Sequence, residues 1–148
     1  MHDHAASHPI WSFQAKLASR LLKWAALSMG LGAALLWGSA FARGFGVQAI
    51  AWGAIDGALA LSARRGTRDK AETAGPVDAA RSARNLRRLL WLNTGLDVLY
   101  VAGGAWLART KGRDNPNWRG QGWSVMVQGA FLFLFDLWHA LKTPGPTR

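Results

Sequence analysis

The stretch from Gln121 to Leu141 reads QGWSVMVQGAFLFLFDLWHAL and carries only two ionisable side chains, those of Asp136 and His139. Its 21 residues show no alternation of apolar and polar positions, and it is about twice the length of a strand in a membrane barrel. A helix needs about 20 mostly apolar residues to cross the hydrocarbon core of a bilayer, which is ~30 Å thick. The stretch therefore predicts a transmembrane helix.

Three further stretches have the same character. One has no ionisable group, one has only Asp56, and one has only Asp97 as a charge within its apolar part. A soluble bundle would show a polar face along each helix, whereas the first stretch offers only two serines. The sequence therefore predicts an all-α fold, a four-helix transmembrane bundle that occupies residues 24–141. The predicted spans are 24–42, 44–63, 87–108 and 121–141.

The composition excludes several classes of protein. The chain has 148 residues, which is typical of one domain, and 50% of them are hydrophobic. It has no cysteine, which excludes a disulfide scaffold, a thiolate metal centre and a cysteine nucleophile. Its net charge of +10 would suit a nucleic-acid binder, but such proteins interleave basic residues with exposed aromatic ones. Here the charges are excluded from long apolar stretches, so we expect no nucleic-acid partner.

Tryptophan and basic residues predict how the bundle lies in the bilayer. Six of the nine tryptophans lie near the ends of the apolar stretches, as expected for indole rings at the two headgroup layers. Of the 18 Lys and Arg, 13 lie before the first span, between the second and third, or after the fourth, and five lie in the other two loops. The positive-inside rule therefore predicts that both termini are cytoplasmic.

Residues 9–23, which precede the first span, have an amphipathic pattern. Their apolar face holds Ile10, Phe13, Leu17 and Leu21, and another face holds Lys16, Arg20 and Lys23. A basic helix of this kind lies in the plane of an anionic leaflet, so we expect an N-terminal interfacial amphipathic helix. A plain extension of the first span is the alternative. The motif Ala40-Phe41-Ala42 resembles a signal-peptidase site, but we expect the first span to stay uncleaved because it is near full spanning length.

Anionic lipid headgroups are expected partners of the basic segments. Arg81, Arg84 and Arg88 share one helical face where the chain enters the third span, and there they can contact lipid phosphate groups. The alternative is that they only anchor the span by the positive-inside effect. Residues 1–8 and 142–148 are expected to form tails. The first tail is expected to be disordered, with its histidines a weak metal chelator at most.

Each of the last three spans contains one aspartate. Asp56, Asp97 and Asp136 lie about 8–12 Å from the cytoplasmic ends of their stretches at 1.5 Å per residue, so three helices can place a carboxylate in one layer. Further polar residues share these helical faces, namely Gln48, Asn93, Tyr100, Gln128 and His139. The spacing Gln48-x7-Asp56 recurs as Gln128-x7-Asp136, which suggests a repeated hairpin.

This polar layer leads to two hypotheses. Carboxylates at close range in a low dielectric cannot all stay ionised, so we expect that one is protonated or that a cation sits among them. His139 is a candidate cation, metal ligand or proton partner for Asp136, and Asn93 and Tyr100 are candidate donors to Asp97. The layer is then a binding site for a proton or a cation. The alternative is structural, with polar side chains linking helices at ~1 kcal/mol or less per pair.

Three patterns stand out within residues 25–141. They are Ala51-Trp52-Gly53-Ala54-Ile55-Asp56, Leu92-Asn93-Thr94-Gly95-Leu96-Asp97-Val98 with Tyr100, and Gln128-Gly129-Ala130-Phe131-Leu132 through Asp136 and His139. In these patterns the chain resembles a domain-of-unknown-function family of small bacterial four-span membrane proteins. The resemblance implies a four-span fold in a bacterial inner membrane. It brings no activity, substrate or assigned site.

No motif identifies a catalytic residue or a cofactor. The sequence has no Gly-rich phosphate loop and no His-Glu-x-x-His zinc motif, and it leaves metal binding open. We therefore expect a multi-pass integral membrane protein with a structural or partner-binding role, as a homo-oligomer or beside a membrane partner protein. The first alternative is a proton- or cation-handling protein that uses the aspartate layer. The second is an enzyme that acts on a lipid headgroup.

Overall fold

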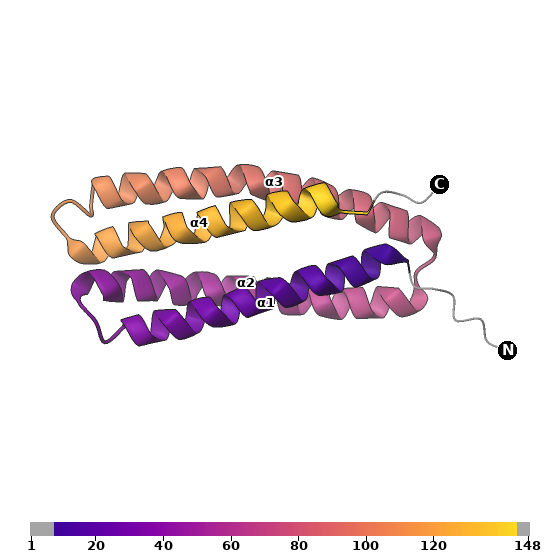
Figure 1. The fold of residues 1–148 in the computed structure, drawn as a ribbon, viewed down its shortest axis with the longest axis horizontal. Coiled ribbons are helices and arrows are strands. Elements are labelled where there is room, and N and C mark those ends of the chain that lie inside the picture. Colours follow the sequence, from indigo (N-terminus) through magenta and orange to yellow (C-terminus); the bar gives the residue numbers. More distant parts are fainter. Residues whose placement is uncertain (1–7, 145–148) are drawn as a thin grey trace.

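The computed structural model describes residues 8–144, and this part of the chain is all-α, with four helices and no strand (Figure 1). The helices are α1 (Pro9–Leu35), α2 (Ala40–Thr73), α3 (Pro76–Arg109) and α4 (Pro116–Lys142). The four-helix, all-α fold predicted from the sequence is confirmed. Most of the two predicted tails, including His2 and His4, lies outside the described residues.

Short sequence signals set the ends of the helices. A proline stands in the first turn of α1, α3 and α4, where its missing N–H leaves no helical hydrogen bond unmade. Ser39 caps α2 by accepting a hydrogen bond from the backbone N–H of Ala42. Asn115 caps α4 by accepting from the backbone N–H groups of Asn117 and Trp118. Such caps satisfy N–H groups that the first turn of a helix leaves unpaired.

The helix boundaries differ from the expected ones in three places. The first predicted span, 24–42, contains the turn between two helices, because α1 ends at Leu35 and α2 begins at Ala40. Residues 9–23 are not a separate helix, because α1 runs without a break from Pro9 to Leu35. The polar segment after Ala63 is not a loop, because α2 continues to Thr73 and α3 begins at Pro76. The reason is local: residues 64–73 consist mostly of good helix formers such as Arg, Lys, Glu and Ala.

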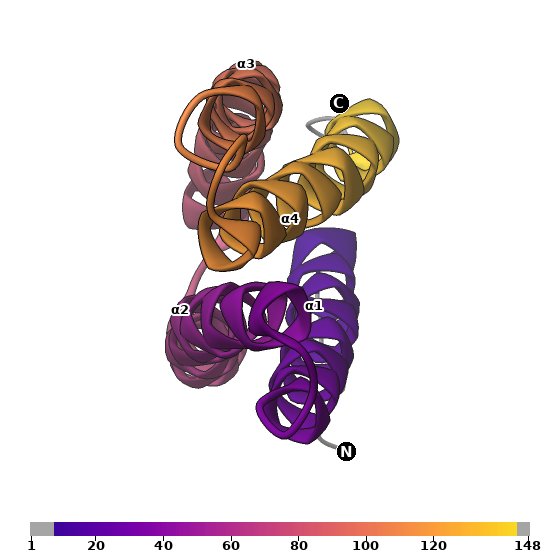
Figure 2. The ribbon, with the colours of Figure 1, turned by 90° about the vertical axis from the view of Figure 1, so that its left-hand side faces the viewer.

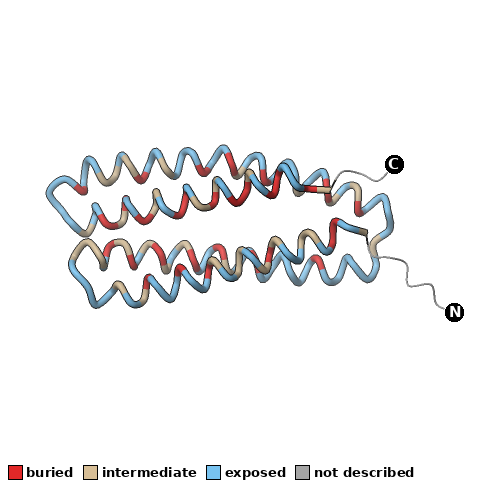
Figure 3. The backbone as a smooth tube through the Cα atoms, in the orientation of Figure 1, coloured by how far each residue is buried: buried red, intermediate tan, exposed pale blue. Residues whose placement is uncertain are grey.

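Two helical hairpins lie side by side. The turns of the α1–α2 and α3–α4 hairpins are at one end of the bundle, here called the hairpin end. The α2–α3 connection, the start of α1 and the end of α4 are at the other, the open end (Figure 1). Each hairpin packs internally, and the two are joined mainly through α2 and α4. In the end-on view α4 lies between α3 and the α1–α2 hairpin (Figure 2). Buried residues follow the inner faces of the helices along their length (Figure 3).

The first turns of α1 are part of this packing. Ile10 and Trp11 form a small apolar core with Ala79 and Ala83 of α3. The apolar face that predicts an interfacial helix is therefore covered at this point by the chain itself. Burial of these side chains removes apolar surface from water at about 25 cal/mol per Å², which ties the start of α1 to the start of α3.

Reciprocal glycine contacts hold each hairpin together. A Cβ atom on Gly32 would lie 2.7 Å from the carbonyl oxygen of Gly46, and one on Gly46 would lie 2.5 Å from that of Gly32. In the second hairpin the corresponding distances between Gly104 and Gly122 are 2.7 and 2.6 Å. Real Cβ atoms essentially never come this close to another heavy atom. Both hairpins therefore depend on bare backbone at their crossing point.

A third glycine pair brings the hairpins together. A Cβ atom on Gly44 of α2 would clash with the carbonyl oxygen of Asn117, and one on Gly120 of α4 would clash with that of Phe41. Phe41 and Asn117 are separated along the chain by the same interval as Gly44 and Gly120, so α2 and α4 meet with approximate two-fold symmetry. The interval between Asp56 and Asp136 is about one helical turn longer, so these two aspartates lie out of this register.

We expect Gly44→Ala and Gly120→Ala each to lower the free energy of unfolding by about 1–3 kcal/mol, because the added methyl group overpacks the α2–α4 contact. Gly66→Ala is the matched control on α2, since no atom lies within 4 Å of its added Cβ. The control is expected to gain about 0.5–1 kcal/mol from helix propensity. Thermal unfolding of the purified variants, followed by circular dichroism, measures the difference. Equal stability of Gly44→Ala and Gly66→Ala would contradict the close contact.

Candidate functional site

The three aspartates converge on one cavity. Asp56 of α2, Asp97 of α3 and Asp136 of α4 are 3%, 2% and 7% exposed, and all three line a cavity of about 180 Å³. Asn93 and Tyr100 line the same cavity, as does Leu21 of α1. Five of the six residues predicted from the sequence to form a proton or cation site are therefore brought together, from three helices.

Few hydrogen bonds satisfy the carboxyl groups. The Oδ2 atoms of Asp56 and Asp97 are buried and have no hydrogen-bond partner. Because they line one small cavity, the three carboxyl groups would also repel one another if all were charged. A buried, unpartnered carboxylate oxygen is costly, so this cavity suits neutral acids or an added positive charge.

Aromatic and apolar side chains complete the cavity walls. Trp52 and Tyr100 meet edge to face, with ring centroids 4.9 Å apart. Tyr100 is 38% exposed, and its neighbours on the walls, Ile55 and Leu59, are exposed as well. The cavity therefore opens sideways between α2 and α3 through an apolar mouth, while its polar groups lie at its inner end.

The described residues hold no group of three or more His, Asp or Glu side chains arranged to bind a metal ion. The aspartates thus share a cavity without forming a coordination shell. What the arrangement can do chemically is to exchange protons with the cavity or to neutralise a positive charge inside it.

His139 lies outside the aspartate cavity. Its Nδ1 atom is 2.7 Å from the carbonyl oxygen of Phe135, and its Nε2 atom is 3.2 Å from Nη1 of Arg20. A carbonyl oxygen only accepts and a guanidinium only donates, so Nδ1 carries the proton and Nε2 accepts. The ring is therefore neutral in this arrangement and links α4 to α1. It is not the cation that the sequence placed beside Asp136.

A second polar group connects α1 to α4 nearer the hairpin end. The indole Nε1 of Trp24 donates to Oε1 of Gln128 at 2.9 Å, and Nε2 of Gln128 donates to Oγ of Ser28 at 3.2 Å. The ring of Trp24 also stacks on that of Phe131 with centroids 3.6 Å apart. Gln128, predicted as a secondary polar residue, thus links two helices rather than lining the cavity.

Gln48, the other predicted secondary residue, also lies away from the aspartates. Its Nε2 atom donates to Oε1 of Gln121 at 3.3 Å, and Gln121 in turn donates to Oδ1 of Asn117 at 2.8 Å. The sequence reasoning missed Gln121, Asn117 and the partners of Gln128. Asn117, Gln121 and Gln128 are spaced so that they lie along one side of α4. This spacing is the sequence signal from which these polar contacts could have been predicted.

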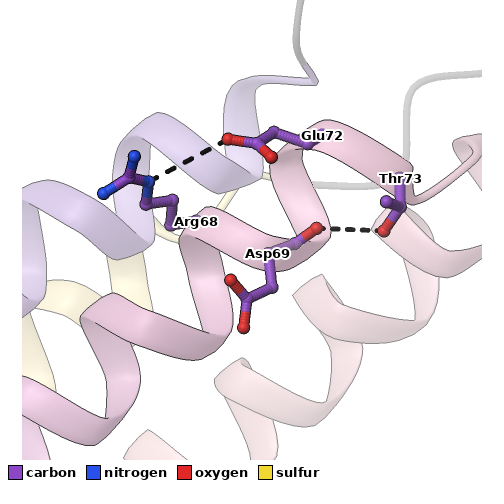
Figure 4. Close-up of polar contacts among 4 residues, drawn as sticks. All are labelled: Arg68, Asp69, Glu72 and Thr73. Atoms are coloured by element: carbon purple, nitrogen blue, oxygen red, sulfur yellow. Dashed lines mark hydrogen bonds and ion pairs between the residues drawn. The ribbon is translucent and has the colours of Figure 1, made fainter.

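The open end of the bundle is strongly basic. Arg81, Arg84 and Arg88 of α3 are exposed there, and Arg64, Arg65 and Arg68 line a hollow of about 510 Å³ between α1 and α2 together with Trp11. Within residues 8–144 the one ion pair joins Arg68 to Glu72 at 3.9 Å (Figure 4). Next to it, the hydroxyl of Thr73 donates to the carbonyl oxygen of Asp69. Most of this positive charge therefore has no acidic partner within the part of the chain that the structure describes.

The chain belongs to a family of unknown function (DUF6992), whose model matches residues 20–137. The resemblance to a family of unknown function that the sequence predicts is thereby confirmed. The matched segment contains all three cavity aspartates. No curated protein and no solved structure matches the chain significantly.

Two buried serines provide a matched test of the polar contacts. Ser28 and Ser124 are 3% and 0% exposed, but the hydroxyl of Ser28 accepts from Gln128 whereas that of Ser124 has no partner. We expect Ser28→Ala to lower the free energy of unfolding by about 1 kcal/mol, and Ser124→Ala to leave it unchanged or raise it. Denaturant unfolding of the two variants checks the order. The reverse order would show that the Gln128 contact does not form.

Proposed function

We propose that this chain is an integral membrane protein whose four helices all cross the bilayer and whose aspartate cavity binds protons or small monovalent cations. The observation that carries the site is the pair of buried, unpartnered Oδ2 atoms of Asp56 and Asp97. A site that only linked helices would pair these oxygens with donors.

Two of the helices, α2 and α4, are long and apolar enough to cross a membrane. Only 33% and 39% of their apolar stretches are buried within the bundle, whereas the core helix of a soluble protein buries most of such a stretch. The outer faces of α1 and α3 also expose large apolar side chains, including Leu27, Leu31, Leu92 and Leu99. These surfaces support membrane insertion of all four helices, because soluble proteins rarely expose such wide apolar patches.

The distribution of charge supports the same proposal. Between Lys23 and Arg43, and between Arg88 and Arg109, the only charged side chain is that of Asp97, which is buried. The corresponding stretches of α2 and α4 contain Asp56, Asp136 and His139, which are buried too. On α2, α3 and α4 this belt without exposed charge is about 20 residues long, which corresponds to the ~30 Å of a hydrocarbon core. On α1 the belt covers only residues 24–35, because the helix ends at Leu35.

The excess of basic residues at the open end supports an orientation with that end and both termini in the cytoplasm. Arg81, Arg84 and Arg88, with the hollow lined by Arg64 and its neighbours, would then face anionic lipid headgroups. The bacterial inner membrane expected from the family resemblance stays a prediction, as does a homo-oligomer or a membrane partner protein.

A proton or cation site is favoured over an enzyme that acts on a lipid headgroup. The aspartate cavity, at about 180 Å³, is smaller than the ~300–1,000 Å³ of pockets that enclose larger ligands. The larger hollow at the open end is lined by arginines and contains no carboxylate or histidine. A reaction on a headgroup bound in this hollow would lack a side chain that acts as an acid or a base.

The topology can be tested with single cysteines, because the chain has none of its own. Thr73→Cys at the open end and Thr110→Cys at the hairpin end are a matched pair, since each exposed hydroxyl bonds to the carbonyl oxygen four residues earlier. In intact cells we expect a membrane-impermeant maleimide to label only Thr110→Cys. After permeabilisation the reagent should also label Thr73→Cys. It should still not label Leu27→Cys, because Leu27 lies in the apolar belt. Labelling of Leu27→Cys by this water-soluble reagent would contradict membrane insertion.

Asparagine variants separate a binding site from a structural link. We expect Asp97→Asn and Asp56→Asn to keep the fold and to raise the free energy of unfolding by about 1 kcal/mol or more, because each removes an unsatisfied acid from the cavity. In the wild type, the infrared band of protonated carboxyl groups should change with pH. In each variant this pH-dependent band should be smaller by the contribution of one carboxyl group. Asp69→Asn, an exposed acid on α2, is the control and should change neither quantity. Lower stability with an unchanged infrared signal would favour the structural role.

A further inference from the structure

We infer that the aspartate cavity is a site for a small organic ammonium ion, which enters it from the lipid between α2 and α3. This inference rests on the proposed function and names the class of ligand for the same site.

The inner end of the cavity favours an added positive charge over ionised acids alone, but it offers no ion cage. Asp56 and Asp97 are at least nine-tenths buried, line the cavity and each have an unpartnered Oδ2 atom. A metal ion would need several ligand atoms converging at fixed distances, and the described side chains form no such group. A charge spread over a larger ion needs only proximity to the carboxylates.

The outer part of the cavity suits the carbon atoms of such an ion. Trp52 and Tyr100 present aromatic surfaces, and ring faces attract alkylammonium groups through cation–π interactions. Leu21 and Leu132 contribute apolar surface from α1 and α4. A hydrated inorganic ion would gain nothing from these walls, whereas methyl or ethyl groups on nitrogen would be buried against them.

The size and the mouth of the cavity narrow the class further. A volume of about 180 Å³ is below the ~300–1,000 Å³ of pockets for drug-sized ligands, so it suits an ion of the size of tetramethylammonium. Ile55 and Leu59 at the mouth are 52% and 59% exposed, and in the proposed orientation in the bilayer they face lipid. Leu59 lies five residues from Arg64, about 8 Å along α2, so a small organic cation reaches the mouth from the headgroup layer without crossing the hydrocarbon core.

Binding of this ion is coupled to release of protons. The titratable groups that face the cavity are Asp56, Asp97, Asp136 and Tyr100, and α1 contributes only Leu21. Arg20, one residue from Leu21, is hydrogen-bonded to His139 instead. Arrival of one cation allows one neutral acid to ionise and its proton to leave, so the charge in the cavity is conserved.

The test uses the full chain purified in detergent, with tetramethylammonium as probe and uncharged tert-butanol as its isostere. Isothermal titration in weakly buffered solution measures binding and proton release together. We expect saturable binding of tetramethylammonium with release of up to one proton, and no binding of tert-butanol. Asp97→Asn should weaken binding at least tenfold and Trp52→Leu roughly three- to thirtyfold. Trp52→Phe, which keeps an aromatic ring, should bind more tightly than Trp52→Leu, and the exposed control Asp69→Asn should bind like the wild type. Circular dichroism and gel filtration confirm that each variant is folded.

The other outcomes overturn the inference in distinguishable ways. If sodium or potassium binds as tightly as tetramethylammonium, or if the acids titrate without binding any organic cation, the ligand class is wrong and the proposed proton or cation site survives. If neither proton exchange nor cation binding depends on Asp97, the proposed function fails as well. Binding that is lost in Asp97→Asn but unchanged in Trp52→Leu would overturn the role of the aromatic wall and with it the organic ligand.

Discussion

The backbone contact between α2 and α4 at Gly44 and Gly120 is the constraint on which the rest of the structure depends. Each hairpin closes on its own glycine pair, and this contact then joins one hairpin to the other near the hairpin end. It sets how far apart the two helices lie where Asp56 and Asp136 face the same space. Without it, the aspartates of different hairpins would not share a cavity, and the site would have no inner end.

The same contact explains why the two sides of the bundle differ. Approximate two-fold symmetry relates the glycine contacts of α2 and α4, but the chemistry does not follow it. Between α1 and α4 the space is filled by Trp24, Gln128 and the ring of His139, whose polar atoms find partners there. Between α2 and α3 the corresponding space holds carboxyl groups that remain unsatisfied. The backbone arrangement is thus nearly symmetric, but the space between α1 and α4 is filled whereas a cavity remains between α2 and α3. Of these two spaces, only the cavity can take a ligand.

Unsatisfied acids are unfavourable for stability, and their retention in a bundle this small is the main argument for function. Polar groups that hold helices together are found paired, as at Gln128 and Ser28, where each donor has an acceptor. The aspartate cavity violates this rule at two oxygen atoms. Such departures concentrate at functional sites, where a ligand or proton supplies the missing partner.

The sequence by itself determined the helical class, the apolar belt and the three buried acids, because hydropathy and helical spacing are local properties that survive any arrangement of the helices. It also placed Asn93, Tyr100 and Asp97 on one face, since they lie on a single helix. The sequence could not place His139, whose partner Arg20 is 119 residues away, or show that residues 9–23 would pack on α3. The sequence also could not predict how α2 and α4 are aligned along their length. The repeated Gln-x7-Asp spacing would pair equivalent residues of the two helices at one interval along the chain, but the glycine contacts pair them at an interval about one helical turn shorter. Only the tertiary structure decided these points, because contacts between helices depend on where backbones can approach, and that is set by the pairing of glycines far apart in the chain.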